Sequence, residues 1–71
     1  MHLVQLRERA GLTQKALAAA SGIGHSTIAS WELGRRTPAS GVLVEKLRAP
    51  LSASHDDMDR LFLSAGLPLP P

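Results

Sequence analysis

Residues 14–34 read QKALAAASGIGHSTIASWELG, a run in which small apolar residues precede a turn that contains glycine. The side chains before the turn are mostly alanines, which let a neighbouring helix backbone approach closely. Ala18 is expected where the two helices cross, although alanine is also a generic helix former. Gly22 stands where the turn needs a positive φ, which costs glycine little. The run therefore predicts two short helices that meet at a tight corner.

The segment after this corner is expected to be a helix over residues 25–33. At about 100° per residue, Ile28 and Trp31 lie within about 60° of each other and form a buried stripe. The opposite arc carries small or polar side chains, namely His25, Ser26, Ala29 and Ser30. A helix that presents such a face beyond a tight corner indicates a helix-turn-helix, whose second helix enters the major groove of DNA.

Two helices are expected before the corner. Leu3, Leu6 and Ala10 recur at helical spacing, and Gly11 ends this first helix. The second helix begins at Thr13, whose hydroxyl can cap free backbone amides, and runs to about residue 20.

A fourth helix is expected over residues 40–49, closed by Pro50, which cannot continue it. Its apolar face comes from Leu43 or Val44, together with Leu47 and Leu51. A fifth helix opens near Ser54, and acidic residues at its start favour the positive end of the helix dipole. Its core stripe has the spacing i, i+3, i+4 and i+7 and consists of Met58, Leu61, Phe62 and Ala65.

The chain is expected to form one all-α domain of five helices over residues 1–66, with residues 67–71 as a proline-rich tail or linker stump. A domain of this size buries roughly 60% of its unfolded surface. Because the chain has no cysteine, neither disulfides nor thiolate metal sites can staple it. Helix packing alone must then hold the fold.

Positive charge is concentrated in the N-terminal half. Residues 1–38 carry a net charge of +3, whereas residues 39–71 carry −1. This asymmetry is expected if only the first half meets phosphate, and scattered surface charge is the alternative interpretation. With one Trp, one Phe and no Tyr, the chain lacks the stacking platform of a single-strand nucleic-acid binder.

Several classes of protein are disfavoured by the sequence. No signal peptide is recognisable, and no apolar run approaches the ~20 residues that a bilayer requires, so a cytoplasmic, nucleoid-associated protein is expected. His2, His25 and His55 lie far apart, without the spacing of metal ligands. No paired acid and base or activated nucleophile stands out, so we expect no metal, no cofactor and no enzymatic activity.

A longer pattern surrounds the corner. It consists of Leu6-Arg7, Gly11-Leu12-Thr13-Gln14, Leu17-Ala18, Gly22-Ile23, Ser26-Thr27-Ile28, Trp31-Glu32 and Gly34-Arg35-Arg36-Thr37-Pro38. In this pattern the chain resembles the Xre/Cro-type helix-turn-helix family, the lambda-repressor-like DNA-binding domain. The resemblance is close over about residues 3–51 and looser in the fifth helix. It implies a compact five-helix domain that binds double-stranded DNA.

The resemblance also implies roles for individual residues. The side chains that would contact DNA phosphates are Gln14, Thr27, Arg35 and Arg36. Those that would read base edges are His25, Ser26 and Ser30. The turn and the core of the motif would be formed by Ala18, Gly22, Ile28 and Trp31. A structural ion pair would join Arg7 to Glu32, whereas two solvated charges are the alternative.

The chain departs from the family pattern at several positions. Recognition positions in the family often carry Gln, Asn or Arg, which can hold a base in bidentate fashion. Here they are a histidine and two serines, which favours modest or water-mediated base reading. Ser21 stands where a more apolar residue is usual, and Arg48 stands where a small buried residue is usual.

Leucines near the C-terminus are candidates for contacts with another chain. Leu63 points away from the core stripe of the fifth helix, and Leu67 and Leu69 follow it. They are either scattered surface leucines or a patch for a second subunit or a missing effector domain. The fifth helix of the family often forms part of a dimer interface.

The sequence therefore favours sequence-specific binding of double-stranded DNA by a bacterial or phage transcriptional regulator, with residues 25–33 in the major groove. The alternative is a protein-interaction module on the same fold, antitoxin-like or coactivator-like, with weak or no reading of DNA. The short recognition side chains and the apolar surface of the fifth helix support this alternative.

Overall fold

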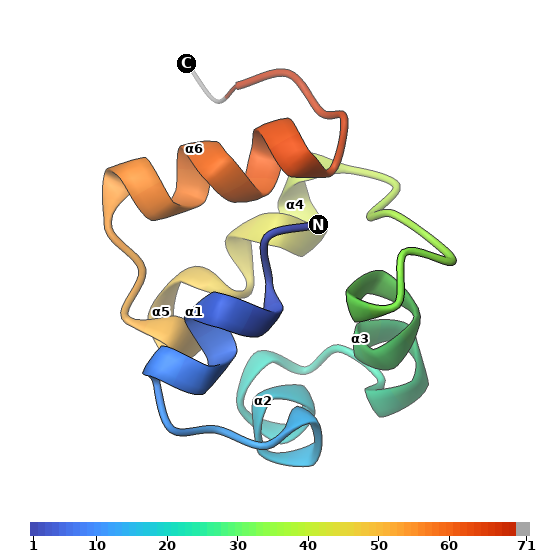
Figure 1. Cartoon of the computed structure of the whole chain (residues 1–71), viewed down its shortest axis with the longest axis vertical. Helices are drawn as coiled ribbons and strands as arrows, with labels where there is room; N and C mark the ends of the chain where they lie inside the picture. Colours follow the sequence, from blue (N-terminus) through green and yellow to red (C-terminus); the bar gives the residue numbers. More distant parts are fainter. Residues whose placement is uncertain (70–71) are drawn as a thin grey trace.

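The computed structural model describes residues 1–69, and every regular element in that range is an α-helix (Figure 1). The elements are α1 (Val4–Arg9), α2 (Gln14–Ser21), α3 (His25–Glu32), α4 (Gly41–Glu45), α5 (Arg48–Leu51) and α6 (His55–Ser64). The predicted all-α fold of five helices is confirmed with one change, because α4 and α5 together replace the expected fourth helix.

Local side-chain chemistry sets the starts of two helices. The Thr13 hydroxyl accepts a hydrogen bond from the Ala16 amide over 3.0 Å, which begins α2. Ser54 and Asp57 form a capping box at the start of α6, in which each side chain accepts a hydrogen bond from the other residue's amide. Each such contact satisfies an amide that has no partner within its own helix.

The prediction that one helix over residues 40–49 ends at Pro50 is wrong. The Leu47 amide bonds to the Val44 carbonyl three residues back, which tightens the chain and separates α4 from α5. Pro50 lies inside α5, in its first turn, where a backbone N–H has no helical partner to lose. This division leaves Val44, Leu47 and Leu51 all buried.

The helices surround one core, to which each of them contributes. Its residues are Leu3, Leu6, Leu17, Ile23, Ile28, Trp31, Val44, Leu47, Leu51, Met58, Leu61 and Phe62. Leu43 is only half-buried, so Val44 is the residue that α4 contributes to the core. Ala10, expected in the apolar stripe of α1, is instead the C-cap residue of that helix and is exposed.

The two unusual residues noted in the sequence are both accommodated. The Ser21 hydroxyl donates to the Ala18 carbonyl and accepts from the Ile23 amide, so it helps to close the turn after α2. The Arg48 guanidinium lies at the surface and pairs with Glu45 over 3.0 Å. Neither residue places an unsatisfied polar group in the core of the described chain.

The C-terminal segment follows α6 back over the molecule. The Leu67 amide bonds to the Phe62 carbonyl, and the half-buried Leu67 side chain packs against the core. Pro68 and Leu69 continue along the surface beside Val42 of α4. The last two residues of the expected tail, 70 and 71, lie outside the described residues. None of the described helices combines the length and apolarity needed to cross a bilayer.

Candidate nucleic-acid interface

The α2–α3 corner is formed by backbone conformation and close packing. Gly22 has a φ of 74° and ends α2, and its amide bonds to the Ala18 carbonyl. Ile23 is buried below the turn, and Gly24 is the N-cap of α3. The half-buried Ala18 packs against the core, and α2 and α3 contact each other along the corner. The chain therefore leaves α2 and re-enters a helix within three residues.

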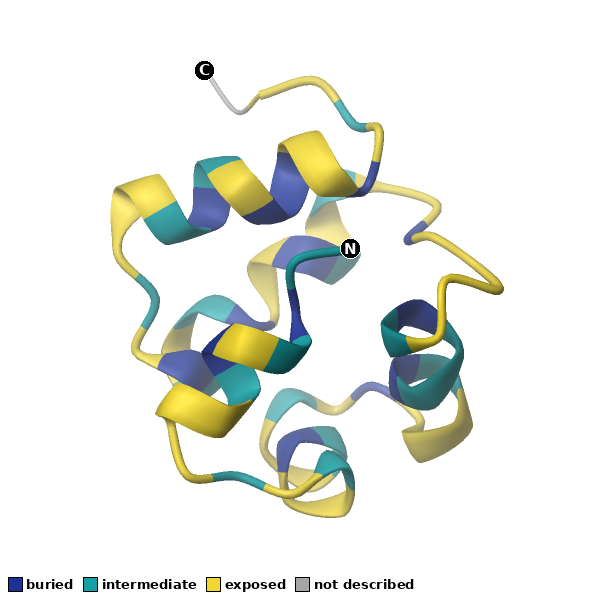
Figure 2. Cartoon of the chain, viewed as in Figure 1, coloured by how far each residue is buried: buried dark blue, intermediate teal, exposed yellow. Residues whose placement is uncertain are grey.

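The two faces of α3 differ in exposure, most strongly at the start of the helix, since Ala29 on the outer arc is half-buried. Ile28 is fully buried and Trp31 is only 2% exposed, so these two side chains hold the helix against the body. His25 and Ser26 are exposed, whereas Ser30 is half-buried one turn later. The start of α3 is accordingly coloured as exposed in Figure 2. Gly24, at the N-cap, is exposed as well. That end is accessible to a large ligand.

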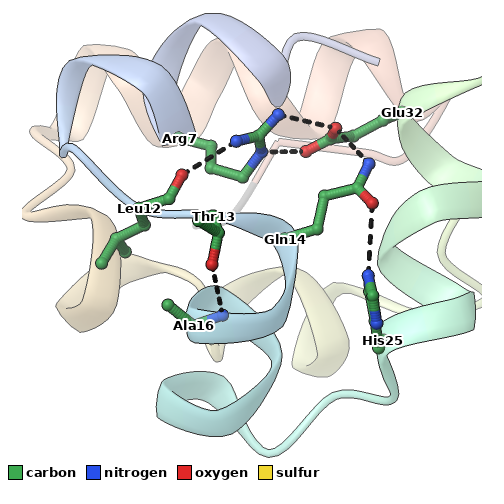
Figure 3. A network of polar contacts seen from close by, with 7 residues as sticks. All are labelled: Arg7, Leu12, Thr13, Gln14, Ala16, His25 and Glu32. Atoms are coloured by element: carbon green, nitrogen blue, oxygen red, sulfur yellow. Dashed lines mark hydrogen bonds and ion pairs between the residues drawn. The ribbon is translucent and has the colours of Figure 1, made fainter.

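An ion pair connects α1 to the end of α3. The Arg7 Nε donates to Glu32 Oε2 over 2.6 Å, and a second guanidinium nitrogen donates to Glu32 Oε1 over 3.2 Å (Figure 3). The same guanidinium donates to the Leu12 carbonyl over 2.8 Å. The Glu32 side chain is only 5% exposed, so its charge is compensated within the protein.

Gln14 extends this ion pair to the exposed start of α3. Its Nε2 donates to Glu32 Oε1 over 2.8 Å, and its Oε1 lies 3.3 Å from His25 Nε2. Arg7, Glu32, Gln14 and His25 thus form one row of polar contacts (Figure 3). Sequence reasoning did not identify the contacts of Gln14 with Glu32 and His25. Gln14 and Glu32 are 18 residues apart, and no local pattern indicates that they meet.

The electrostatics of the Arg7–Glu32 pair favour the ionised form of both side chains. Burial acts to raise the pKa of Glu32, but hydrogen bonds from Arg7 and Gln14, with the charge of Arg7, outweigh it and hold that pKa below its usual range. The hydrogen bond to Glu32 raises the pKa of Arg7. Glu32 therefore remains a carboxylate, which can only accept hydrogen bonds.

Unpaired positive charge follows α3. Arg35 and Arg36 are exposed, and neither forms an ion pair within residues 1–69. Their amides donate to the Ser30 carbonyl, at 3.0 and 3.4 Å, which fixes the backbone of this loop against the helix. Arg9, by contrast, pairs with Asp57 over 2.7 Å. The basic side chains beside α3 are thus available to an anionic partner.

The remaining predicted residues lie as follows. Thr27 is half-buried in the first turn of α3, close to Gly24. Leu63 is 62% exposed on the outer face of α6. Among the residues that the structure describes, no three potential ligands are grouped as a metal ion would require.

Comparison with known proteins agrees with this geometry. A family whose description is "Helix-turn-helix domain" matches residues 1–61, consistent with the resemblance to the Xre/Cro type. No curated protein matches the chain, and no solved structure does. Domains of this kind typically bind DNA and have no enzymatic activity. Since the match spans most of the sequence and includes the α2–α3 corner, the chain belongs to the helix-turn-helix domain family.

Proposed function

We propose that this chain is the sequence-specific, double-stranded-DNA-binding domain of a bacterial or phage transcriptional regulator. The start of α3 enters the major groove, where His25, Ser26 and Ser30 meet base edges. Gln14, Thr27, Arg35 and Arg36 contact the phosphates on either side. A regulator of this kind acts in the cytoplasm, at the nucleoid. A dimer formed through α6 would bind half-sites about 34 Å apart.

One observation carries the proposal. The exposed start of α3 is held by a buried Ile28 and Trp31 and is followed at once by two exposed arginines. A rigid helix end with phosphate-binding cations beside it matches what a groove requires, because phosphate contacts position a protein and base contacts give it specificity. Arg35 and Arg36, the arginines proposed to contact phosphate, form no ion pair within the described chain.

The test is a titration of fluorescently labelled random duplex DNA at low and moderate salt, followed by selection of bound sites from a random pool. Binding that weakens steeply with salt, and enrichment of one sequence, support the proposal. Binding without enrichment limits the function to non-specific contact. Absence of binding at low salt rejects it.

A protein-interaction module is the second candidate, and one surface favours it. An apolar groove between α4, α6 and the C-terminal segment is lined by Val42, Phe62, Leu67 and Leu69. Val42 is 70% exposed and Leu69 is 49% exposed, and both line this one groove, whereas single exposed apolar side chains would need no explanation. Absence of duplex binding would leave this groove as the main functional surface of the domain.

A further inference from the structure

The polar row from Arg7 to His25 has a fixed hydrogen-bond direction. A guanidinium can only donate and a carboxylate can only accept, so Arg7 and Glu32 define one end of the row. The group of Gln14 that faces Glu32 must then be its amide NH₂ group, at 2.8 Å. Its oxygen consequently faces His25 at 3.3 Å, and an oxygen requires a donor there. His25 Nε2 must therefore carry a proton.

We propose that Gln14 is a positioning residue that selects the Nε2–H form of His25 and thereby leaves Nδ1 as an acceptor on the exposed start of α3. No residue among those described hydrogen-bonds to Nδ1. This inference rests on the proposed function, because it concerns which base His25 reads. It means that the part-buried Arg7–Glu32 pair, acting through Gln14, determines which nitrogen of His25 accepts a hydrogen bond on the recognition surface.

Because Nδ1 accepts a hydrogen bond, it can recognise only a base that offers a donor. A lone pair accepts from the exocyclic amino group of adenine or cytosine, whereas guanine and thymine present only acceptors in the major groove. Ser26 and Ser30 have hydroxyls that both donate and accept, so they impose no such polarity. His25 is therefore the side chain that distinguishes amino bases from carbonyl bases, and adenine or cytosine is expected on the strand that it contacts.

Substitution of Gln14 can remove or reverse this polarity. Gln14→Met has a similar length but neither accepts nor donates, so His25 loses its orientation. Gln14→Lys keeps a donor toward Glu32 but offers only donors to His25, so Nε2 must accept and Nδ1 must carry the proton. Gln5→Lys is the matched control for the added charge, because Gln5 is exposed on α1.

The first measurement is the protonation of the two ring nitrogens of His25 by ¹⁵N nuclear magnetic resonance, at about pH 8, where histidines are ordinarily neutral. The wild type and Gln5→Lys should show a single Nε2–H form. Gln14→Met should show a mixture, and Gln14→Lys should shift the population toward Nδ1–H. A predominant Nδ1–H form in the wild type would overturn the proposal, as would identical spectra in all four proteins. Thermal unfolding of each variant checks that the fold is kept.

The second measurement is selection of bound sites from random duplex DNA. The position read by His25 is the one whose preference disappears in His25→Ala. There the wild type should prefer adenine or cytosine by about 3- to 10-fold, the effect of one hydrogen bond. Gln14→Met should lose this preference, and Gln14→Lys should favour guanine or thymine. Unchanged preferences in both Gln14 variants would overturn the inference and leave the proposed function intact. If the wild type binds no duplex, the proposed function and the base preference both fall, whereas the ring protonation still tests the Gln14–His25 link.

Discussion

Arg7 and Glu32 join α1 to the end of α3 through two hydrogen bonds, the shorter of them 2.6 Å from Nε to Oε2. Gln14 connects this pair to the start of α3, because it bonds to the same carboxylate and its oxygen lies 3.3 Å from His25 Nε2. We therefore expect substitutions in this pair to affect both the stability of the domain and the start of α3.

Arg7→Ala should lower the free energy of unfolding by about 2–3 kcal/mol, as expected when a mostly buried carboxylate loses a charged partner. The Glu32 side chain is 5% exposed, so water replaces the guanidinium poorly. The Leu12 carbonyl loses its donor as well. Urea unfolding followed by circular dichroism measures the change.

Arg48→Ala is the matched control for this loss. The Arg48–Glu45 pair has a similar bidentate geometry, but both side chains are 42% exposed. Solvent screening makes such pairs weak, so the control should unfold almost as the wild type does. Equal losses in the two variants would show that burial of Glu32 does not strengthen its pair.

Acid should weaken the domain through Asp57. Hydrogen bonds from the Arg9 side chain and the Ser54 amide hold the pKa of Asp57 well below its ordinary value of 3.8. A carboxyl whose pKa is lower in the folded state stabilises fully above its unfolded pKa, and this stability is lost as pH falls toward the folded value. Thermal melts should therefore show Asp57→Asn less stable than the wild type at pH 7, with a gap that narrows below about pH 4.

Asp56→Asn serves as the comparison for that experiment. It removes a charge from the same helical turn, but Asp56 takes no part in the capping box and does not pair with Arg9. The difference in thermal stability between Asp56→Asn and the wild type should be smaller than that of Asp57→Asn at pH 7. A constant gap for Asp57→Asn from pH 7 to about pH 2 would contradict the argument from the lowered pKa.

The faces of α3 and the start of α6 could be predicted because they depend on short-range spacing. Ile28 and Trp31 share one side of any helix, whatever the rest of the chain does. Ser54 and Asp57 stand three residues apart, which is the spacing of a capping box, and the structure forms it. Local chemistry sets such features before any tertiary contact is considered.

The division of the fourth helix and the position of Gln14 could not be predicted in the same way. The chain tightens at Leu47, whose amide bonds to the Val44 carbonyl three residues back, and this choice of hydrogen bond is not marked by any spacing of apolar residues. The family resemblance alone indicates a phosphate contact for Gln14, which remains a prediction. Its bond to Glu32 depends on a side-chain conformation across two helices, and helical periodicity carries no information about that.

Gly41→Ala should destabilise the domain, although alanine usually favours a helix. A Cβ at Gly41 would lie 2.8 Å from Phe62 Cε1, and Phe62 is only 4% exposed. Overpacking costs about 1–3 kcal/mol, whereas the gain in helix propensity is at most about 1 kcal/mol. A net loss of about 1 kcal/mol should lower Tm by about 4–8 °C in a domain of this size. Phe62→Leu removes the clashing ring atom, so Gly41→Ala should cost less in that background. A rise in Tm for Gly41→Ala alone would show that the ring moves aside freely.

Arg35→Ala should weaken binding to every duplex by a similar factor, because a phosphate contact carries no base information. The slope of log K against log salt should fall in magnitude by about one, the contribution of a single released counterion. Fluorescence titration of the selected site and of a random duplex, each at several salt concentrations, measures both effects.

Arg60→Ala provides the matched control for Arg35→Ala. Arg60 is also exposed, and its substitution removes the same charge. It belongs to α6, which lies at the opposite end of the molecule from α2 (Figure 1). The salt slope of Arg60→Ala should equal that of the wild type, because α6 is not among the elements proposed to contact phosphate. If Arg60→Ala reduced the slope as much as Arg35→Ala, the basic residues would act only through net charge. DNA would then have no preferred position against the loop that follows α3.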